Sequence, residues 1–522
     1  MESGIRKTGT LWDTETEDGK NGTMLTSDGK MYIAQAEKTP LYLLGKMANR
    51  HGLITGATGT GKTVSLQVIA ETLSAAGCPC FMADMKGDLS GISQAGKSTD
   101  FIEKRVKEFG IADADLKFAG CPTRFFDVFG EQGHPLRTTI SEMGPLLLAR
   151  LMNLNDTQTG VLNIVFRIAD EQQLMLIDTK DLRLMLDFVA KHAKDYTTEY
   201  GNIAAQTIGA IQRALMAIET QGGDKFFGEP AFNIHDFIAT EGGRGVINVL
   251  AADKLMASPL LYSTFLLWML SELYTQLPEV GDPEIPKLAF FFDEAHTLFN
   301  GTQKAFLDKV EQVVRLVRSK GVGVYFVTQL PDDVPQAILG QLGNRIQHAL
   351  RAFTPRDQKA VKAAAQSFRA NPDFDTEAAI TELGTGEALV SLLDEKGAPA
   401  MVQKAKMMFP LSQIGPIPDD VRTEMIRTSP LAGRYDTMAD NISAYEILSE
   451  RNAEEAKRQV VNEQAAVEAK QQAVEAKAGA AASKRPARMS LFEKIFSSIA
   501  TSLGRQVGTS IVRGVLGNIL KK

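Results

Sequence analysis

Short apolar runs alternate with longer stretches of helical periodicity along most of the chain. The apolar runs have the length of strands, and hydrophobic residues fill consecutive positions in them rather than every second one. Strands buried on both faces have this composition, and helices between them supply the crossovers of a parallel sheet. The pattern predicts an α/β fold, a mostly parallel sheet with helices on both faces. The predicted strands are residues 51–55, 78–84, 245–250, 287–294 and 321–329.

The pattern changes in four other parts of the chain. Strand signals nearly vanish between about residues 136 and 235, which predicts an all-helical insertion into the core. Residues 387–407 have the pattern of a hairpin that turns at 395–397. The polar residues before position 40 fit either a small β-appendage or a disordered leader. The predicted division is an N-terminal extension (1–40), the first part of the core (41–135), the insertion (136–235), the second part of the core (236–445), a charged helix or linker (446–483) and a basic segment (484–522).

The C-terminal part has two compositions. Residues 446–483 are rich in Ala, Glu, Lys and Gln, which predicts a solvated helical tail or a weak coiled coil. Residues 484–522 hold eight Lys and Arg against one acid, and their apolar residues recur every four positions, so this segment is amphipathic if it is helical. It could dock on its own oligomer, lie on a membrane surface or contact DNA. Apart from this segment, the sequence indicates no membrane partner.

Composition narrows the class of protein. The chain has 522 residues, of which 44% are hydrophobic and 23% are charged, values that are ordinary for a globular protein with a sizeable core. The net charge of −6 argues against a surface coated in basic residues but leaves room for a local basic channel. Three cysteines without a second Cys or His cluster argue against a metal site of that kind and fit a reducing compartment. No long apolar run or secretory signal is visible, so we expect a cytoplasmic protein.

A phosphate-binding loop follows the first predicted core strand. Residues 56–63 read GATGTGKT, and an amphipathic helix continues from them. Such a loop points its backbone N–H groups at phosphates, its Lys reaches the β- and γ-phosphates, and its Thr hydroxyl ligates Mg²⁺. The alternative is a glycine-rich turn with a surface lysine. We therefore expect ATP and Mg²⁺ as ligands, Lys62 as a catalytic residue and Thr63 as a metal ligand. The predicted binding residues are Gly56, Ala57, Thr58, Gly59, Thr60, Gly61, Lys62, Thr63 and Val64.

Two adjacent carboxylates end the strand at 287–294. Asp293 suits the Mg²⁺ shell through water, and Glu294 suits polarisation of the attacking water, so hydrolysis is expected rather than transfer to a small acceptor. The alternative is a strand end with two solvated acids. Residues 293–296 also spell DEAH, but helicases of that name carry a second ATPase lobe, and little sheet-forming sequence remains after residue 350. We therefore interpret His296 as a packing residue or a bystander rather than a catalytic residue.

A third polar group accompanies the strand at 321–329. Gln329 ends it and could contact the γ-phosphate or the attacking water. Arg315 and Arg318 precede the same strand, and either could reach the nucleotide of a neighbouring subunit as an arginine finger. The alternative for each arginine is a solvated or salt-bridged side chain.

Four motifs together resemble the HerA/FtsK group of ring-forming ATPases, and most closely its bacterial YjgR (HerA-like helicase) branch. The motifs are GATGTGKT, FMADMKGDLSG, FFFDEAH and VRSKGVGVYFVTQLPDDVP followed by ILGQLGNRIQHAL. The resemblance covers roughly residues 40–450. It implies a RecA-like core, a hexameric homo-oligomeric ring with ATP between subunits, and translocation of a polymer. It also implies that Asp84 and Lys86 lie near the nucleotide. HerA proteins usually carry a complete N-terminal β-barrel, for which residues 1–45 are too short.

Three uses of the ATP remain open. The first is a DNA-translocating or helicase-like motor. The second is an oligomeric ATPase that acts on protein or regulates a partner nuclease or other effector, without nucleic-acid work of its own. The third is a small-molecule kinase, which the paired acids and the late glutamine disfavour.

Overall fold

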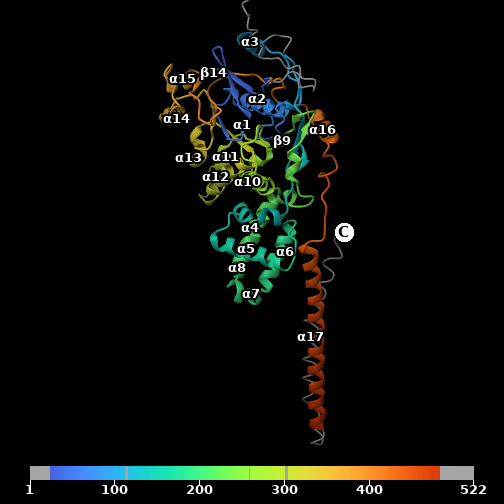
Figure 1. The fold of residues 1–522 in the computed structure, drawn as a ribbon. Coiled ribbons are helices and arrows are strands. Elements are labelled where there is room, and N and C mark those ends of the chain that lie inside the picture. Colours follow the sequence, from blue (N-terminus) through green and yellow to red (C-terminus); the bar gives the residue numbers. More distant parts are fainter. Residues whose placement is uncertain (1–23, 27, 112–115, 258, 300–303, 483–522) are drawn as a thin grey trace, which may run out of the picture. The chain divides into compact units, whose positions relative to one another are not determined.

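The computed structural model describes residues 24–26, 28–111, 116–257, 259–299 and 304–482 (Figure 1). The predicted basic segment 484–522 and most of the predicted extension 1–40 lie outside these residues. The chain divides into two compact units, Met1–Leu448 and Ser449–Lys522. Among the described residues, no helix combines the length and apolar content needed to cross a membrane.

One large sheet organises the first unit. Its strands are β1 Met31–Ala36, β2 Thr39–Leu43, β3 Gly52–Thr55, β4 Cys80–Asp84, β5 Thr123–Asp127, β6 His134–Pro135, β9 Ile247–Ala251, β10 Leu288–Phe292, β11 Val322–Thr328, β12 Asn344–His348, β13 Glu387–Ser391 and β14 Gln403–Met407. A separate short pair is formed by β7 Thr240–Glu241 and β8 Arg244–Gly245.

The order and direction of the strands determine which loops meet at one edge of the sheet. Among the described residues the order is β2-β1-β14-β13-β12-β3-β11-β10-β4-β9-β5-β6. The strands from β12 to β6 run parallel, whereas β13, β14, β1 and β2 are joined antiparallel at one side. The carboxyl ends of β12, β3, β11, β10 and β4 therefore meet at a single edge, where open α/β folds bind ligands.

Helices cover both faces of the sheet. The α-helices of the described residues are α1 Gly45–Ala48, α2 Lys62–Ala75, α3 Asp100–Phe109, α4 Ile140–Leu151, α5 Asp156–Glu171, α6 Thr179–Lys191, α7 Ala193–Tyr200, α8 Ala205–Ile218, α9 Asp224–Phe226, α10 Pro259–Gln276, α11 His296–Phe299, α12 Lys304–Val317, α13 Gln336–Leu339, α14 Pro355–Gln366, α15 Thr376–Glu382, α16 Asp419–Thr428 and α17 Ala444–Ala482. Figure 1 shows α4, α5, α6, α7 and α8 gathered in one block.

Alternate residues of each central strand enter two different cores. In β10, Phe290 and Phe292 pack into the core that α10 and the helical block share, whereas Phe291 packs into the core beneath α2. This alternation is the normal consequence of strand geometry, and it explains why the strand is apolar at every position. The predicted fold class, a mostly parallel α/β sheet with helices on both faces, is confirmed.

Several segments differ from their predicted place. Met31–Ala36 and Thr39–Leu43 are edge strands of the main sheet, with β1 paired to β14, so the domain boundary expected at residue 40 falls inside β2. The pattern also failed to indicate Thr123–Asp127 and Asn344–His348 as core strands. The hairpin predicted over 387–407 is present as β13 and β14.

The second unit contains the rest of α17. Residues 453–474 of this helix are exposed at every position, as expected of a segment with few large apolar side chains.

Candidate functional site

The phosphate loop connects β3 to α2 and depends on glycine geometry. Gly56, Gly59 and Gly61 all have positive φ angles, of 151°, 77° and 114°. A Cβ on Gly56 would lie 2.5 Å from the Cβ of His348, so a side chain at this position would have to displace the neighbouring strand. The loop therefore needs glycine at this position for both its conformation and its packing.

Lys62 and Thr63 begin α2 directly after the loop. The Lys62 side chain is buried, and its Nζ donates to the carbonyl oxygens of Gly56 at 2.7 Å and of Ala57 at 3.1 Å. Thr63 and Val64 are half-buried in the first turn of α2, where backbone N–H groups have no intrahelical partner. The exposed loop residues are Thr58 and Gly59. The ammonium group of Lys62 therefore lies against the loop that it is expected to serve.

Neighbouring strands hold the loop from outside. The Gly56 N–H donates to the Gln329 carbonyl at 3.2 Å, and the Ala57 N–H donates to the Ala349 carbonyl at 2.8 Å. On the far side, the Gly386 N–H donates to the Thr60 carbonyl at 3.0 Å. The loop is thus anchored by the segments that follow β11 and β12 and by the segment that precedes β13.

Asp293 and Glu294 follow β10, two strands away from β3. Both are buried, with relative exposures of 2% and 6%. Asp293 Oδ1 accepts a hydrogen bond from the Glu294 N–H at 2.9 Å, and Glu294 has a left-handed φ of 48°, which is uncommon outside glycine. One oxygen of each carboxylate, Asp293 Oδ2 and Glu294 Oε2, is buried without a hydrogen-bond partner. Unsatisfied buried oxygens of this kind at a sheet edge are candidate ligand positions.

Burial and nearby charges shift the pKa values of the site's ionisable groups in opposite directions. Burial raises the pKa of Asp293 to about 6, although Lys86 acts to lower it. Burial also lowers the pKa of Lys62, while the two carboxylates partly oppose that shift. For Lys86 burial acts to lower the pKa, but its hydrogen bond with Glu294 and the charges of the nearby acids prevail and raise it. Two lysines and two carboxylates therefore interact in a partly desolvated site, an arrangement that is common in catalytic sites.

Lys86 reaches the acid pair from a turn that Asp84 builds. Lys86 Nζ lies 2.6 Å from Glu294 Oε1, and the Lys86 side chain stays 42% exposed. Both oxygens of Asp84 are occupied, because they accept the backbone N–H groups of Gly87, Asp88 and Leu89. Asp84 therefore supports the turn, and Lys86 is the residue of this pair that faces the site.

The remaining predicted residues fall in two places. Gln329 is exposed immediately after β11, beside the phosphate loop to which its carbonyl is bonded. Arg315 is exposed near the end of α12. Arg318 lies before the amino end of β11, and its Nη2 is 3.1 Å from Asp282 Oδ2. The arginines are therefore at the sheet edge opposite to the phosphate loop of the same chain.

The sequence did not indicate that a buried histidine, His348, packs against the phosphate loop. His348 is fully buried, with Nε2 2.9 Å from Ser65 Oγ and Nδ1 2.9 Å from the Glu387 carbonyl. Burial lowers the pKa of His348 to about 4. His296 lies 3.3 Å from Glu294 Oε2 and is 31% exposed at its side chain, so it borders the site rather than the core. No local pattern in the sequence indicated His348, because its strand is mostly polar.

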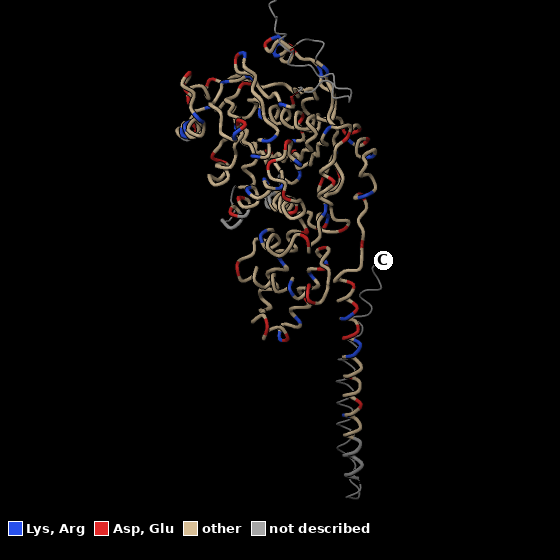
Figure 2. Tube along the Cα trace, viewed as in Figure 1, with Lys and Arg blue, Asp and Glu red and all other residues tan. Residues whose placement is uncertain are grey.

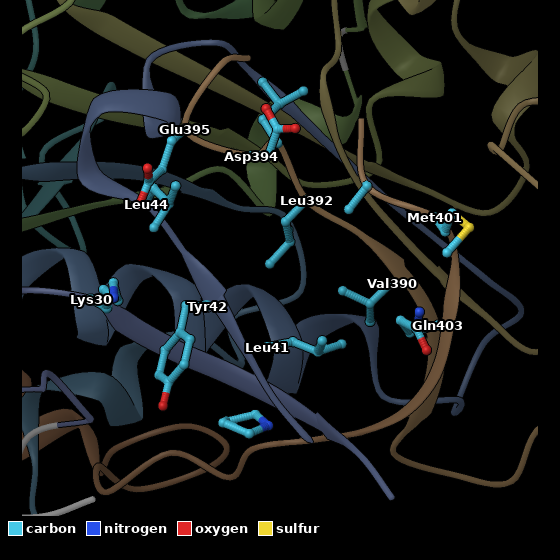
Figure 3. Close-up of a pocket in the computed structure, with 13 residues that line it drawn as sticks. Lys30, Leu41, Tyr42, Leu44, Val390, Leu392, Asp394, Glu395, Met401 and Gln403 are labelled. Carbon is cyan, nitrogen blue, oxygen red and sulfur yellow. The ribbon is translucent and has the colours of Figure 1, made fainter. Parts of the chain in front are cut away.

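A separate cavity of about 270 Å³ lies away from this site (Figure 3). It is lined by residues of β2 and of the β13–β14 hairpin, including Tyr42, Leu392 and Met401. No residue of the phosphate loop or of the acid pair lines it, so it adds nothing to the arrangement described above.

Known proteins and structures place this arrangement in a family. Residues 30–522 match the family described as "Helicase HerA-like C-terminal". An unbound form of the bacterial conjugative coupling protein TrwB is similar in fold, with a TM-score of 0.50 and 14% identity over 74% of this chain and 91% of that chain. Weaker similarities include TrwB in complex with ADP and Mg²⁺ (TM-score 0.49, 15% identity, 78% and 92% covered) and VirB4 of Thermoanaerobacter pseudethanolicus (0.45, 13%, 74% and 96%). No curated protein matches the chain.

The placement within the YjgR branch stays a prediction. The family match itself covers nearly the whole chain, and it agrees with the phosphate loop, the buried acid pair and the parallel sheet that carries them. The chain belongs to the helicase HerA-like C-terminal family and is a P-loop ATPase with a RecA-like fold.

Proposed function

We propose that the protein is a Mg²⁺-dependent ATP hydrolase that works as a ring-forming, DNA-translocating motor. The observation that carries the hydrolytic part is the position of the two halves of the site. The phosphate loop after β3 and the buried pair Asp293–Glu294 after β10 lie at the same edge, with only β11 between them. If the phosphate loop holds the phosphates of ATP, the two carboxylates lie beside the γ-phosphate.

The residues fit a magnesium ion bound together with nucleotide. Mg²⁺ at such sites takes one or two protein oxygens and completes its shell with water and phosphate, so a larger cluster of acids is unnecessary. Asp293 Oδ2 is a buried carboxylate oxygen without a hydrogen-bond partner, and Thr63 offers a hydroxyl in the first turn of α2. When bound, the ion would neutralise charge on the phosphates.

The protein's own groups account for the rest of the reaction. Lys62 would leave the loop carbonyls for the β- and γ-phosphates, which are stronger acceptors. Glu294 would orient the attacking water and accept its proton through Oε2, which has no hydrogen-bond partner but lies 3.3 Å from His296 Nδ1. Gln329, exposed beside the loop, would contact the γ-phosphate or the water. Lys86 would hold Glu294 in place through its ion pair.

The place of Arg318 and Arg315 supports a site that is completed by a neighbouring subunit. Both precede β11, whereas the phosphate loop follows the carboxyl end of β3, and β11 and β3 are parallel. Seven residues of β11 separate the two edges by about 20 Å, given about 3.3 Å per residue. Neither arginine could then serve the nucleotide of its own chain, and a head-to-tail ring is the arrangement that would use one of them.

The DNA part of the proposal rests on family membership and on similarity to TrwB, which is a coupling protein of bacterial conjugation. Figure 2 shows Lys and Arg interspersed with Asp and Glu along the described chain, so the charge pattern does not select the polymer. The test is the ATPase rate with and without double-stranded DNA over a series of salt concentrations. Stimulation that weakens steeply with salt is expected, because contacts with phosphates release counterions.

One variant and the wild-type protein together separate the ATPase part of this proposal from the DNA part. Lys62→Ala should abolish turnover with and without DNA while the protein remains folded. Wild-type turnover in that variant would reject the site. If the wild-type protein hydrolyses ATP but neither binds nor responds to DNA at low salt, the translocase assignment fails, and an ATPase that acts on protein or on a partner effector takes its place.

A further inference from the structure

The position of the acid pair determines the side of the phosphate loop toward which the nucleoside of a bound nucleotide extends. The acid pair lies on the side of β11 and β10, so the terminal phosphate points that way if Glu294 is to act on its hydrolysis. The nucleoside then extends toward the opposite side of β3, where β12 and β13 lie. The residues that face the base should therefore come from the segment that follows β12 and the segment that precedes β13, which meet at this edge because the two strands are antiparallel.

A short glycine-containing segment reaches the loop on that side. The Gly386 N–H donates to the Thr60 carbonyl at 3.0 Å, and a Cβ on Gly61 would lie 3.3 Å from the Gly386 nitrogen. The Gly386 carbonyl accepts from Arg105 Nη2 at 3.0 Å and from the Met407 N–H at 2.9 Å. The segment before β13 is thus fixed between the phosphate loop, α3 and β14.

An exposed aromatic ring stands directly beside this segment. Phe101 is at the start of α3 and is 40% exposed. A Cβ on Gly386 would lie 3.2 Å from the tip of the Phe101 ring, so the ring and the segment are in close proximity, and Gly386 has a φ of 73°, a conformation that favours glycine. The Arg105 guanidinium lies 5.2 Å from the centre of the ring and holds it in place.

We propose that Phe101, together with the segment that contains Gly386, forms the platform on which the base of the nucleotide stacks. The ring is near the last glycine of the phosphate loop, on the side away from the acid pair, and part of it remains open to a ligand. Stacking on an aromatic face tolerates any base, because every base has a π-face. This inference rests on the proposed nucleotide site and adds to it a residue that recognises the nucleoside rather than the phosphates.

The test compares a ligand that has a base with one that lacks it. Equilibrium binding of ATP and of inorganic tripolyphosphate is measured for the wild-type protein and for Phe101→Ala, Phe101→Leu and Phe101→Trp. Loss of one stacking contact predicts ATP binding about 5- to 150-fold weaker in the Ala and Leu variants. Tripolyphosphate binding should stay within about twofold of wild type, the limit set by small changes away from the contact. The Trp variant should restore ATP binding.

Tyr445→Ala is the matched control. Tyr445 has a similar exposure of 42% and carries a cation, Lys180 Nζ, 5.3 Å from its ring centre, but it lies at the start of α17. Its removal should leave ATP binding unchanged. Equal weakening of ATP and tripolyphosphate in the Phe101 variants, or no weakening of either, overturns the stacking platform. Absence of ATP binding in the wild-type protein would instead reject the proposed function.

Discussion

Replacing Asp293 by Asn should stabilise the protein while removing its activity. Burial raises the pKa of Asp293 from 3.8 to about 6, which means that folding places an ionised carboxylate where it is poorly solvated. A shift of this size corresponds to about 3 kcal/mol at pH 8. The buried amide of Asn also loses water, so we expect a net gain of about 1–2 kcal/mol. For a unit of 448 residues this is a rise in melting temperature of about 1–2 °C.

The stability advantage of Asp293→Asn should decrease as the pH falls. The folded protein holds the proton of Asp293 more tightly than the unfolded chain does, so the penalty is complete above pH 6 and shrinks as the pH falls toward 4. The measurement is the melting temperature of both proteins, free of nucleotide, at several pH values from 8 to 5. At pH 5 the penalty should be about 1.4 kcal/mol smaller than at pH 8, which removes most or all of the advantage of Asp293→Asn. Asp332→Asn makes the same change at an exposed site and should show no such trend. A stability difference that is absent, or constant with pH, refutes the reasoning.

Two further predictions concern the loop and the subunit interface. Gly56→Ala should weaken ATP binding about 5- to 150-fold, since the new Cβ would meet His348 at 2.5 Å at a φ of 151°, a strain of about 1–3 kcal/mol. Gly160→Ala, where the Cβ has free space, is its control, and equal affinity in both variants would contradict the packing argument. Arg318→Ala and Glu294→Gln subunits should each be inactive alone and regain activity when mixed, because one mixed interface keeps both groups. Asp282→Asn, which breaks the ion pair but keeps the guanidinium, should remain active, and mixtures that assemble without recovery would remove Arg318 from that role.

The central strands could be predicted because they are buried on both faces. Leu288–Phe292 is apolar at every position, and its alternate residues enter different cores, so the run is visible in the sequence without any knowledge of neighbours. The phosphate loop and the acid pair follow such runs directly. Their meeting at one edge then follows from the parallel topology alone.

The missed strand β12 shows the limit of this reasoning. Asn344–His348 contains a single large apolar residue, yet most of the strand is buried. Its polar groups are satisfied by distant partners: Asn344 Nδ2 donates to the Met47 and His51 carbonyls, and Gln347 Oε1 accepts from Thr55 Oγ1 at 2.7 Å. A polar strand of this kind is stable only inside the finished fold, so no local pattern reveals it.

The sequence also did not indicate that Gly386 and Phe101 lie beside the phosphate loop. Gly386 and Phe101 are separated from the phosphate loop by long stretches of sequence, and they reach it only because β13 pairs antiparallel with β12 while α3 is fixed by Arg105. The expectation that Asp84 lies near the nucleotide stays a prediction; what the sequence could not indicate is that its carboxylate accepts hydrogen bonds from the turn that carries Lys86. Spacing along the chain could identify the residue types of this motif but could not assign their partners.

The most direct test of the account is the behaviour of Glu294→Gln. If the buried carboxylate beside the phosphate loop accepts the proton of the attacking water, this variant should bind ATP with an affinity close to that of the wild-type protein. Its kcat for ATP hydrolysis should nevertheless fall by about 10²–10⁴. Single-turnover hydrolysis and equilibrium binding of ATP, measured on the same preparation, separate the two effects. A variant that binds ATP and hydrolyses it at the wild-type rate would contradict the claim that this edge of the sheet is a hydrolytic site.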